Sequence, residues 1–142
     1  MDAEQIIQKL MDLEVFVLEE DMRVYFKYIS QLPENSNILD LATGWGKSAI
    51  AMALSNPKVS IASIDNGRDP MDFYQQFNSL EHYTKTLTDR FRKYGAENIS
   101  FTLGDLLKMR VPKERYDLFH LDISVDNEAK ILERWLPSVK KN

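Results

Sequence analysis

The stretch ILDLATGWGKSAI, residues 38–50, contains the features from which the fold can be inferred. A short apolar run ends in Asp40, a turn with Gly44 and Gly46 follows, and small residues continue after the turn. A run of this kind is typical of a buried strand, and glycines permit the left-handed backbone of a tight turn. The stretch therefore predicts a strand, a turn and a helix, with a ligand site at the turn.

The letters GKS in this stretch also occur in phosphate-binding loops, whose pattern is G-x-x-x-x-G-K-S. That pattern needs its leading glycine, because the backbone must curl until its amides face the phosphates. Leu41 occupies the leading position, and its branched side chain would obstruct the curl. We therefore expect no nucleotide-hydrolysing site, and Lys47 is interpreted as part of a helix start.

A dinucleotide fingerprint, G-x-G-x-x-A, is matched by Gly44, Gly46 and Ala49, and Asp65 follows the second glycine by 19 residues. An acid at that position accepts hydrogen bonds from a ribose. Asp40, however, lies before the glycines, where a fixed negative charge would repel a pyrophosphate and attract an ammonium or sulfonium group. The charge favours adenosylmethionine, and an NAD(P)-binding Rossmann oxidoreductase is the less favoured alternative.

The rest of the chain predicts an α/β fold, a Rossmann-like doubly wound parallel sheet. The sequence contains four apolar runs typical of strands, and segments with helical periodicity lie among them. The four runs are ILDL, VSIASID, NISFTLGD and YDLFHLDI. Alternating elements of this kind specify a parallel sheet with helices on both faces. Residues 37–142 are the predicted cofactor-binding domain. Residues 1–36 predict a helical cover or lid, formed by two helices or by one helix broken near LEVFV.

Helical periodicity also places sets of apolar residues on common faces. In the N-terminal segment these sets are Ile6, Ile7, Leu10 and Met11, then Leu18, Met22, Tyr25, Phe26 and Ile29. A long helix is predicted from a cap at Asp69 and Pro70 to a stop at Gly95, with an aromatic stripe that includes Phe77. A last helix is predicted after a cap at Asp126. Its apolar face consists of Ile131, Leu132, Trp135, Leu136 and Val139.

These motifs, in this order, resemble the class I S-adenosylmethionine-dependent methyltransferases, and small O-methyltransferases among them. The stretch ILDLATGWGKSAIAMA is similar to the first motif of that family, with Ala42 in the position of its first glycine. Alanine is the smallest replacement and is expected to narrow the loop only slightly. The resemblance implies S-adenosyl-L-methionine as cofactor and methyl transfer to a small-molecule acceptor, with oxygen as the expected acceptor atom. It also implies a seven-stranded sheet, of which this sequence contains four strands.

The resemblance implies a role for each residue at the strand ends. The cofactor loop would consist of Asp40, Ala42, Thr43, Gly44, Trp45 and Gly46. Asp65, with Asn66 beside it, would accept hydrogen bonds from both ribose hydroxyls. Asp105 would take the adenine amino group, and the backbone of Leu106 would flank the ring. Asp122 would lie where the transferable methyl group meets the acceptor.

Methyl transfer to a hydroxyl group also needs a group that removes a proton. Asp122 and His120 point to the same face of the predicted fourth strand, since they are two residues apart. Asp122 is the predicted base because it lies at the strand end, whereas His120 is interpreted as a hydrogen-bonded core histidine. Similar O-methyltransferases bind a divalent metal through a D-x-D pair, but Ser124 replaces the second acid, so no metal is expected.

Composition and charge narrow the classes of function. The 142 residues are enough for one core, and the absence of cysteine excludes disulfides and a thiolate nucleophile. A net charge of −4 argues against a nucleic-acid partner, and the basic cluster at 108–115 is interpreted as a solvated loop. No apolar run approaches the length of a membrane span, so we expect no membrane partner. The lack of cysteine and an N-terminus unlike a secretory signal favour a cytoplasmic protein.

The predicted fourth strand has a consequence for assembly. With only four strands accounted for, this strand would lie at the sheet edge, where unpaired backbone groups invite association. We therefore expect either that the chain is a fragment of a longer methyltransferase or that a partner, such as a second copy in a homo-oligomer, covers the edge. A non-catalytic adenosylmethionine-binding or oligomerising domain is the alternative function.

Overall fold

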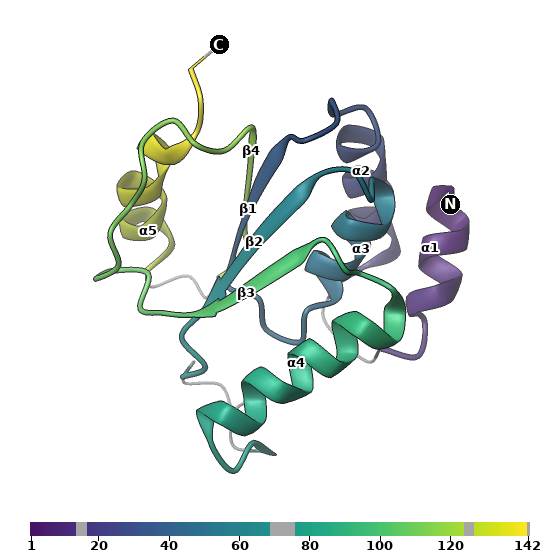
Figure 1. Ribbon diagram of the computed structural model, residues 1–142, viewed down its shortest axis with the longest axis horizontal. Helices are drawn as coiled ribbons and strands as arrows, with labels where there is room; N and C mark the ends of the chain where they lie inside the picture. The colour runs from purple at the N-terminus through teal and green to yellow at the C-terminus, as the bar shows by residue number, and fades with distance from the viewer. Residues whose placement is uncertain (14–16, 69–75, 124–126, 142) are drawn as a thin grey trace.

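The computed structural model describes residues 1–13, 17–68, 76–123 and 127–141. Its centre is a sheet of four parallel strands in the order β3-β2-β1-β4 (Figure 1). The strands are β1 Asn37–Leu41, β2 Ser60–Asp65, β3 Ile99–Leu103 and β4 Leu118–Leu121. All four predicted strands are confirmed.

Helices cover both faces of the sheet (Figure 1). Their bounds are α1 Ala3–Leu10, α2 Glu19–Ile29, α3 Lys47–Ser55, α4 Leu80–Tyr94 and α5 Glu128–Trp135, with the short 3-10 helix η2 at Leu136–Ser138. Both α1 and α2 pack against α3, while α5 lies on the opposite face. Every residue of α3 is buried, because α1, α2, β2 and β3 all pack against this helix. Within the described ranges, no helix is both long and apolar enough to cross a membrane.

The order of the strands reverses at β1. The chain passes from β1 through β2 to β3 on one side, and β4 then pairs with the other side of β1. Doubly wound sheets bind their ligands at such a reversal, outside the carboxyl ends of the strands. The loop that follows β1 therefore occupies the position where this class of sheet binds a ligand, and the predicted α/β class is confirmed.

Strand β1 separates two parts of the core, because its side chains alternate between the faces of the sheet. Ile38 packs in the cluster that includes residues of α1, α2, α3 and α4, whereas Leu39 and Leu41 pack in the cluster on the α5 side. Asp40 alternates with Leu39 and Leu41 and so shares the face of Ile38. A carboxylate is thereby placed on the face of the sheet that α1, α2, α3 and α4 cover.

The helix predicted from Asp69 begins later in the structure. It starts directly after Ser79, whose hydroxyl accepts a hydrogen bond at 3.0 Å from the amide three residues on. Phe77 therefore precedes α4 instead of lying on its apolar stripe, whereas the predicted stop at Gly95 is confirmed. The predicted start was wrong because Ser79 supplies the cap that the first turn needs. Residues 69–75, which include the predicted cap, lie outside the described residues.

Four residues that were predicted on buried helical faces are exposed: Met11, Leu18, Leu132 and Leu136. The buried residues of α5 are Ile131 and Trp135, because this helix contacts the sheet along a narrow stripe with a spacing of four. Asn127 occupies its N-cap position, and the predicted cap Asp126 lies outside the described residues.

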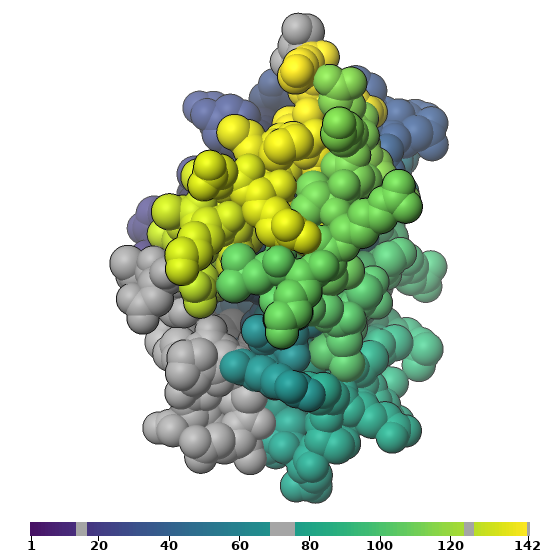
Figure 2. Space-filling view, turned by 90° about the vertical axis from the view of Figure 1, so that its left-hand side faces the viewer, coloured from purple at the N-terminus to yellow at the C-terminus, as the bar shows by residue number. Residues whose placement is uncertain are grey.

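The loop that follows β3 lies against α5, as Figure 2 shows in green and yellow. Trp135 is 1% exposed, and its indole nitrogen donates to the carbonyl oxygen of Leu106 at 2.8 Å. The neighbouring Arg134 donates to the carbonyl oxygen of Met109 at 2.5 Å. Two successive residues of α5 therefore fix the backbone of the loop.

The segment after η2 extends the pairing beyond β4. Val139 forms a parallel bridge with Tyr116, and the amide of Lys140 donates to the carbonyl oxygen of Tyr116 at 2.8 Å. This pairing lies just before β4, and β4 itself is at the edge of the described sheet, as predicted. The residues of β4 are half-buried, because among the described strands only β1 pairs with β4. A partner that covers the remaining edge stays a prediction.

We expect Trp135→Phe to lower the free energy of unfolding by about 1–3 kcal/mol, because the carbonyl oxygen of Leu106 would lose its donor inside the core. Denaturant unfolding followed by circular dichroism measures the loss. Leu132→Ala, on the exposed side of the same helix, is the matched control and should change stability by less than about 0.5 kcal/mol. Equal stability of Trp135→Phe and the wild type would contradict the role of this hydrogen bond.

Candidate active site

The loop between β1 and α3 has a left-handed backbone at three positions. The φ angles are 68° at Ala42, 52° at Gly44 and 81° at Gly46. Glycine adopts such angles freely, but an alanine there is strained by about 1–2 kcal/mol. The cost of replacing the first glycine of the motif therefore lies in the backbone angle of Ala42, and not in the size of its side chain.

Side chains from α4 and the segment before it hold this loop. The Tyr83 hydroxyl donates to the carbonyl oxygen of Gly44 at 2.7 Å. The Arg90 guanidinium lies 4.4 Å from the centre of the Trp45 ring and donates to the Trp45 carbonyl oxygen at 2.8 Å. The ring of Phe77 packs against Trp45 at a centroid distance of 5.7 Å. The loop is therefore anchored to α4 and to the segment that precedes this helix.

Asp65, at the end of β2, lies directly beside the loop. Its carboxylate accepts hydrogen bonds from the amide of Gly44 at 3.0 Å and from the amide of Gly67 at 2.7 Å. Asp65 is 4% exposed, whereas Asn66 is exposed and accepts a hydrogen bond from the amide of Arg68 at 2.8 Å. The structure thus brings the acid of the second strand and the glycine loop together. The ribose contacts of Asp65 and Asn66 stay predictions.

Asp105 and Leu106 follow β3 and are both engaged locally. The Asp105 carboxylate accepts from the amide of Leu107 at 2.9 Å and forms an ion pair with Lys108 at 3.3 Å. The amide of Leu107, followed by Lys108, lowers the pKa of Asp105. Leu106 is buried, and its carbonyl oxygen is bonded to Trp135. Asp105 thus caps the turn that presents these residues, and their contacts with adenine stay predictions.

Asp40 is fully buried, and protein groups meet both of its oxygens. Its Oδ1 lies 2.7 Å from Nδ1 of His120, and its Oδ2 accepts from the Ser63 hydroxyl at 2.5 Å. The Thr43 hydroxyl lies 2.7 Å from that of Ser63. Strand register explains the arrangement, since Ser63, Asp40 and His120 are aligned on adjacent strands. The predicted pairing of Asp40 with an ammonium or sulfonium group stays a prediction.

Tyr25 of α2 extends this row of polar side chains. Its hydroxyl lies 3.0 Å from Nε2 of His120, and the two rings meet edge to face at 5.2 Å. The His120 side chain is 15% exposed, which agrees with its interpretation as a hydrogen-bonded core histidine. Sequence reasoning missed Tyr25 and Ser63. A polar residue inside the apolar run VSIASID could have drawn attention to Ser63, but no sequence pattern connects Tyr25 with a histidine 95 residues away.

Three acids shape the electrostatics of this row. Burial opposes the charging of the imidazole, but the hydrogen bond and charge of Asp40, together with the charges of Asp122 and Asp21, outweigh burial and raise the pKa of His120. Burial, followed by the same three charges, raises the pKa of the Tyr25 phenol. The row is therefore suited to carry a proton on His120 while Tyr25 stays neutral.

Asp122, the predicted base, follows β4 and is exposed. Its amide lies 3.4 Å from the carbonyl oxygen of Leu41, and its charge acts on both Tyr25 and His120. Ser124 lies outside the described residues. In the part of the chain that the structure describes, no three His, Asp or Glu side chains gather as they would around a metal. The absence of a metal stays a prediction, as does the role of Asp122.

The Lys47 side chain points away from the glycine turn. Its ammonium group donates to the carbonyl oxygen of Leu13 at 3.1 Å, and burial lowers the pKa of Lys47. A phosphate loop would direct this lysine toward the phosphates bound by the loop amides. The contact with the N-terminal segment agrees with the interpretation of GKS as a helix start.

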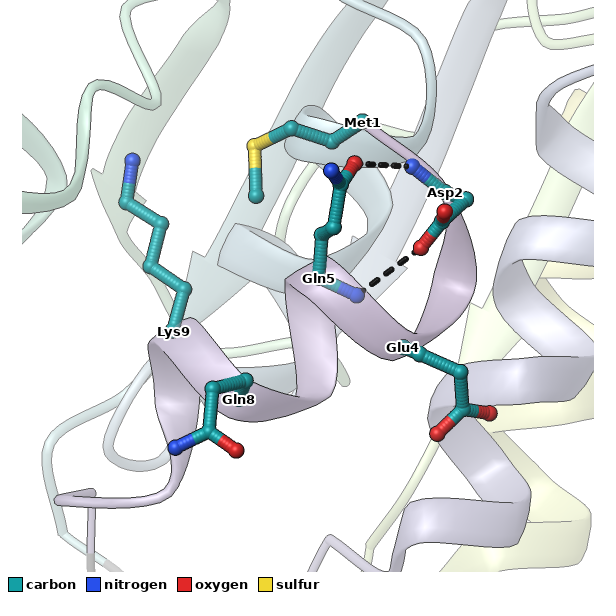
Figure 3. Close-up of a pocket in the computed structure, with 6 residues that line it drawn as sticks. All are labelled: Met1, Asp2, Glu4, Gln5, Gln8 and Lys9. Carbon is teal, nitrogen blue, oxygen red and sulfur yellow. Dashed lines mark hydrogen bonds between the residues drawn. The ribbon is translucent and has the colours of Figure 1, made fainter.

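A hollow also lies on α1 (Figure 3). Its lining residues are Met1, Asp2, Glu4, Gln5, Gln8 and Lys9. The side chains of Asp2 and Gln5 each accept a hydrogen bond at 2.9 Å from the other residue's amide, so they are occupied in capping the helix. None of the predicted site residues lines this hollow. We therefore assign no site to it.

Comparison with solved structures relates this arrangement to known proteins. A Staphylococcus aureus protein assigned as a caffeoyl-CoA O-methyltransferase matches 99% of this chain, with a TM-score of 0.68 and 16% identity. A SAM-dependent methyltransferase from Aquifex aeolicus also matches 99% of this chain and 68% of its own, with a TM-score of 0.61 and 21% identity. The chain has the class I methyltransferase fold.

This chain matches only part of the length of these neighbours. The chain spans 62% of the length of the Staphylococcus protein. The cyclase SpnF shares the fold with a TM-score of 0.61 and 17% identity over 84% of this chain and 41% of its own, so the fold accommodates more than one reaction. No protein-family model and no curated protein matches the sequence.

Replacing the loop glycines by alanine tests the loop geometry. At Gly44 an added Cβ meets no heavy atom of the described residues within 4 Å, so Gly44→Ala carries only a backbone cost of about 1–2 kcal/mol. At Gly46 the Cβ would lie 2.7 Å from the Phe91 ring, and we expect a further loss of about 1–3 kcal/mol. Ala42→Gly relieves the same backbone strain and should be at least as stable as the wild type. Denaturant unfolding measures all three, and equal losses at the two glycines would contradict the packing.

The pH dependence of stability tests the environment of His120. The raised pKa of His120 means that the folded protein binds this proton more tightly than the unfolded chain, in which a histidine titrates at about 6.5. The resulting stabilisation is present below that pH and is lost as pH rises through the folded pKa. The free energy of unfolding should therefore decline more steeply above pH ~6.5 in the wild type than in His120→Gln. His82→Gln is the control and should keep the wild-type slope.

Proposed function

We propose that this chain binds S-adenosyl-L-methionine at the carboxyl ends of β1, β2 and β3 and transfers its methyl group to a small-molecule acceptor. The observation that carries the proposal is the contact between Asp65 and the glycine loop at the reversal of the sheet. An acid in this position can accept hydrogen bonds from ribose hydroxyls in place of the loop amides. When bound, the cofactor supplies an electrophilic methyl group.

The chain's own residues would bind and orient the two substrates. The loop from Ala42 to Gly46 would border the cofactor. At Gly44 an added Cβ meets no heavy atom of the described residues within 4 Å, which leaves room for a ligand against the backbone. Asp65 would fix the ribose, and Asp105 with the backbone of Leu106 would border the adenine. Positioning of this kind supplies much of the catalysis in a displacement reaction, because the reacting atoms must be held close and in line.

We propose oxygen as the acceptor atom. The O-methyltransferase assignment of the Staphylococcus aureus neighbour supports this choice. Two parts of the chain would border the acceptor. One is the exposed Asp122 at the end of β4, and the other is the proposed cover, residues 1–36, which contains α1 and α2. The absence of a nucleic-acid partner agrees with the net charge of the chain, and a cytoplasmic location agrees with its lack of cysteine; both stay proposals.

A second candidate function is adenosylmethionine binding without methyl transfer. The observation that favours it is the cyclase SpnF, which has the same fold.

Isothermal titration calorimetry with adenosylmethionine, adenosylhomocysteine and NADH separates the candidates. We expect binding of the first two ligands and none of NADH. Binding of NADH alone would refute the proposal in favour of an oxidoreductase. Labelled methyl transfer to a panel of phenols, sugars and small acids then distinguishes an enzyme from a binding domain, because only the enzyme yields labelled product.

We expect Asp65→Ala to weaken the affinity for adenosylhomocysteine by about 1–3 kcal/mol, because charge-assisted hydrogen bonds to the ribose would be lost. The same calorimetric titration measures the change. Asp89→Ala removes an exposed acid from α4 and is the matched control, with unchanged affinity. An Asp65→Ala protein that binds as tightly as the wild type would refute the ribose role.

A further inference from the structure

A continuous line of hydrogen bonds crosses the sheet beside the proposed cofactor loop, from Thr43 through Ser63, Asp40 and His120 to Tyr25. An ionised carboxylate only accepts hydrogen bonds, so Ser63 donates to one oxygen of Asp40 and Nδ1–H of His120 donates to the other. Ser63 then accepts from the Thr43 hydroxyl. With its proton on Nδ1, neutral His120 presents Nε2 as an acceptor, and the Tyr25 hydroxyl donates to it.

We propose that Tyr25, His120 and Asp40 form a proton relay that removes the proton of the methyl acceptor. Tyr25 is the catalytic residue that contacts the acceptor, His120 receives the proton, and Asp40 is a positioning residue that fixes the imidazole. The relay rests on the proposed function, and it gives His120 the role that the sequence analysis assigned to Asp122.

The bonds and charges of the step balance. A lone pair of the acceptor oxygen forms the bond to the methyl carbon, and the carbon–sulfur bond breaks with its electron pair left on sulfur. The acceptor's proton moves to the hydroxyl oxygen of Tyr25 as the proton of Tyr25 moves to Nε2 of His120. The positive charge of the sulfonium thus ends on an imidazolium whose Nδ1 lies 2.7 Å from Asp40. No further reactant is consumed.

The surroundings of the relay favour this direction of proton transfer. Asp40 from β1, Asp122 at the end of β4 and Asp21 from α2 all stabilise a positive charge on His120. The same acids and burial disfavour a phenolate on Tyr25, so Tyr25 transmits a proton without accumulating negative charge. Asp122 is exposed, and its described contacts include no side chain that would orient its carboxylate toward an acceptor.

The placement of Tyr25 supports contact with the acceptor. Its helix, α2, packs against α3, and its hydroxyl contacts the side chain of His120 on β4. Asp122, which ends that strand, lies near enough to act on the phenol. The relay therefore connects the proposed cover with the strand end where the methyl group and the acceptor would meet.

The tautomer of His120 tests the relay without an acceptor. The chain has two histidines, so long-range proton–nitrogen NMR resolves His120 from His82, which serves as internal reference. We expect neutral His120 to carry its proton on Nδ1, and Asp40→Asn to lower its pKa and move that proton to Nε2. Tyr25→Phe keeps Asp40 in place and should retain the Nδ1 proton, which preserves the readout if Asp40→Asn does not fold. A proton on Nε2 in the wild type would overturn the relay.

Labelled methyl transfer from adenosylmethionine to the phenol panel tests the proton step. The transfer rate should rise with pH through the His120 pKa measured by NMR and then level off. Tyr25→Phe should reduce the rate by about 10²–10⁴-fold with unchanged affinity for adenosylhomocysteine. Tyr28→Phe, which alters an exposed tyrosine on the same helix, is the matched control. A Tyr25→Phe protein with the wild-type rate and pH profile would overturn the relay.

The two proposals fail in different ways. Wild-type protein that binds neither adenosylmethionine nor adenosylhomocysteine removes the proposed function, while the NMR result separately decides whether the hydrogen-bonded row exists. Binding and transfer with an undiminished Tyr25→Phe rate remove the relay and leave the function standing. Binding with no transfer to any member of the panel counts against both the enzyme and its relay.

Discussion

The Asp40 carboxylate is fully buried, and the arrangement around β1 follows from the need to compensate that charge. Removing a carboxylate from water costs several kcal/mol unless protein groups replace the lost hydration. Here a hydroxyl from β2 and an imidazole from β4 replace it, one on each oxygen. These groups come from the two strands that flank β1. The compensation of the Asp40 charge therefore depends on the register of all three strands and on the polar residues that they carry. A substitution that removed only one partner would leave a buried charge unsatisfied.

The backbone directly after β1 is strained. Ala42 directly follows β1 with a left-handed φ of 68°, and its amide donates to the carbonyl oxygen of Ile64 at 2.9 Å. Strain of this kind persists only where neighbouring contacts fix the chain on both sides. Asp65 supplies such a contact from β2, and Tyr83 with Arg90 supplies others from α4. The loop is therefore shaped before any ligand binds, which reduces the entropy that binding would cost.

Much of this fold could be predicted from the sequence, because the four apolar runs and the glycine turn are local signals. The stop of α4 at Gly95 was likewise readable, whereas its start was not, since the cap at Ser79 competes with an equally plausible cap at Asp69. The acids at the strand ends could be named for the same local reason. The contact between Tyr25 and His120 could not, because it depends on how α2 packs across the sheet, and packing at long sequence separation leaves no local pattern.

The hydrogen bond between Tyr25 and His120 joins a helix of the N-terminal segment to the edge strand β4. Any displacement of α2 that breaks this contact changes how strongly His120 holds its proton. Linkage makes the effect reciprocal, so the protonation of His120 must alter the preferred position of α2 by the same free energy. The position of the N-terminal helix α2 and the protonation state of His120 inside the sheet are therefore governed by one coupled equilibrium.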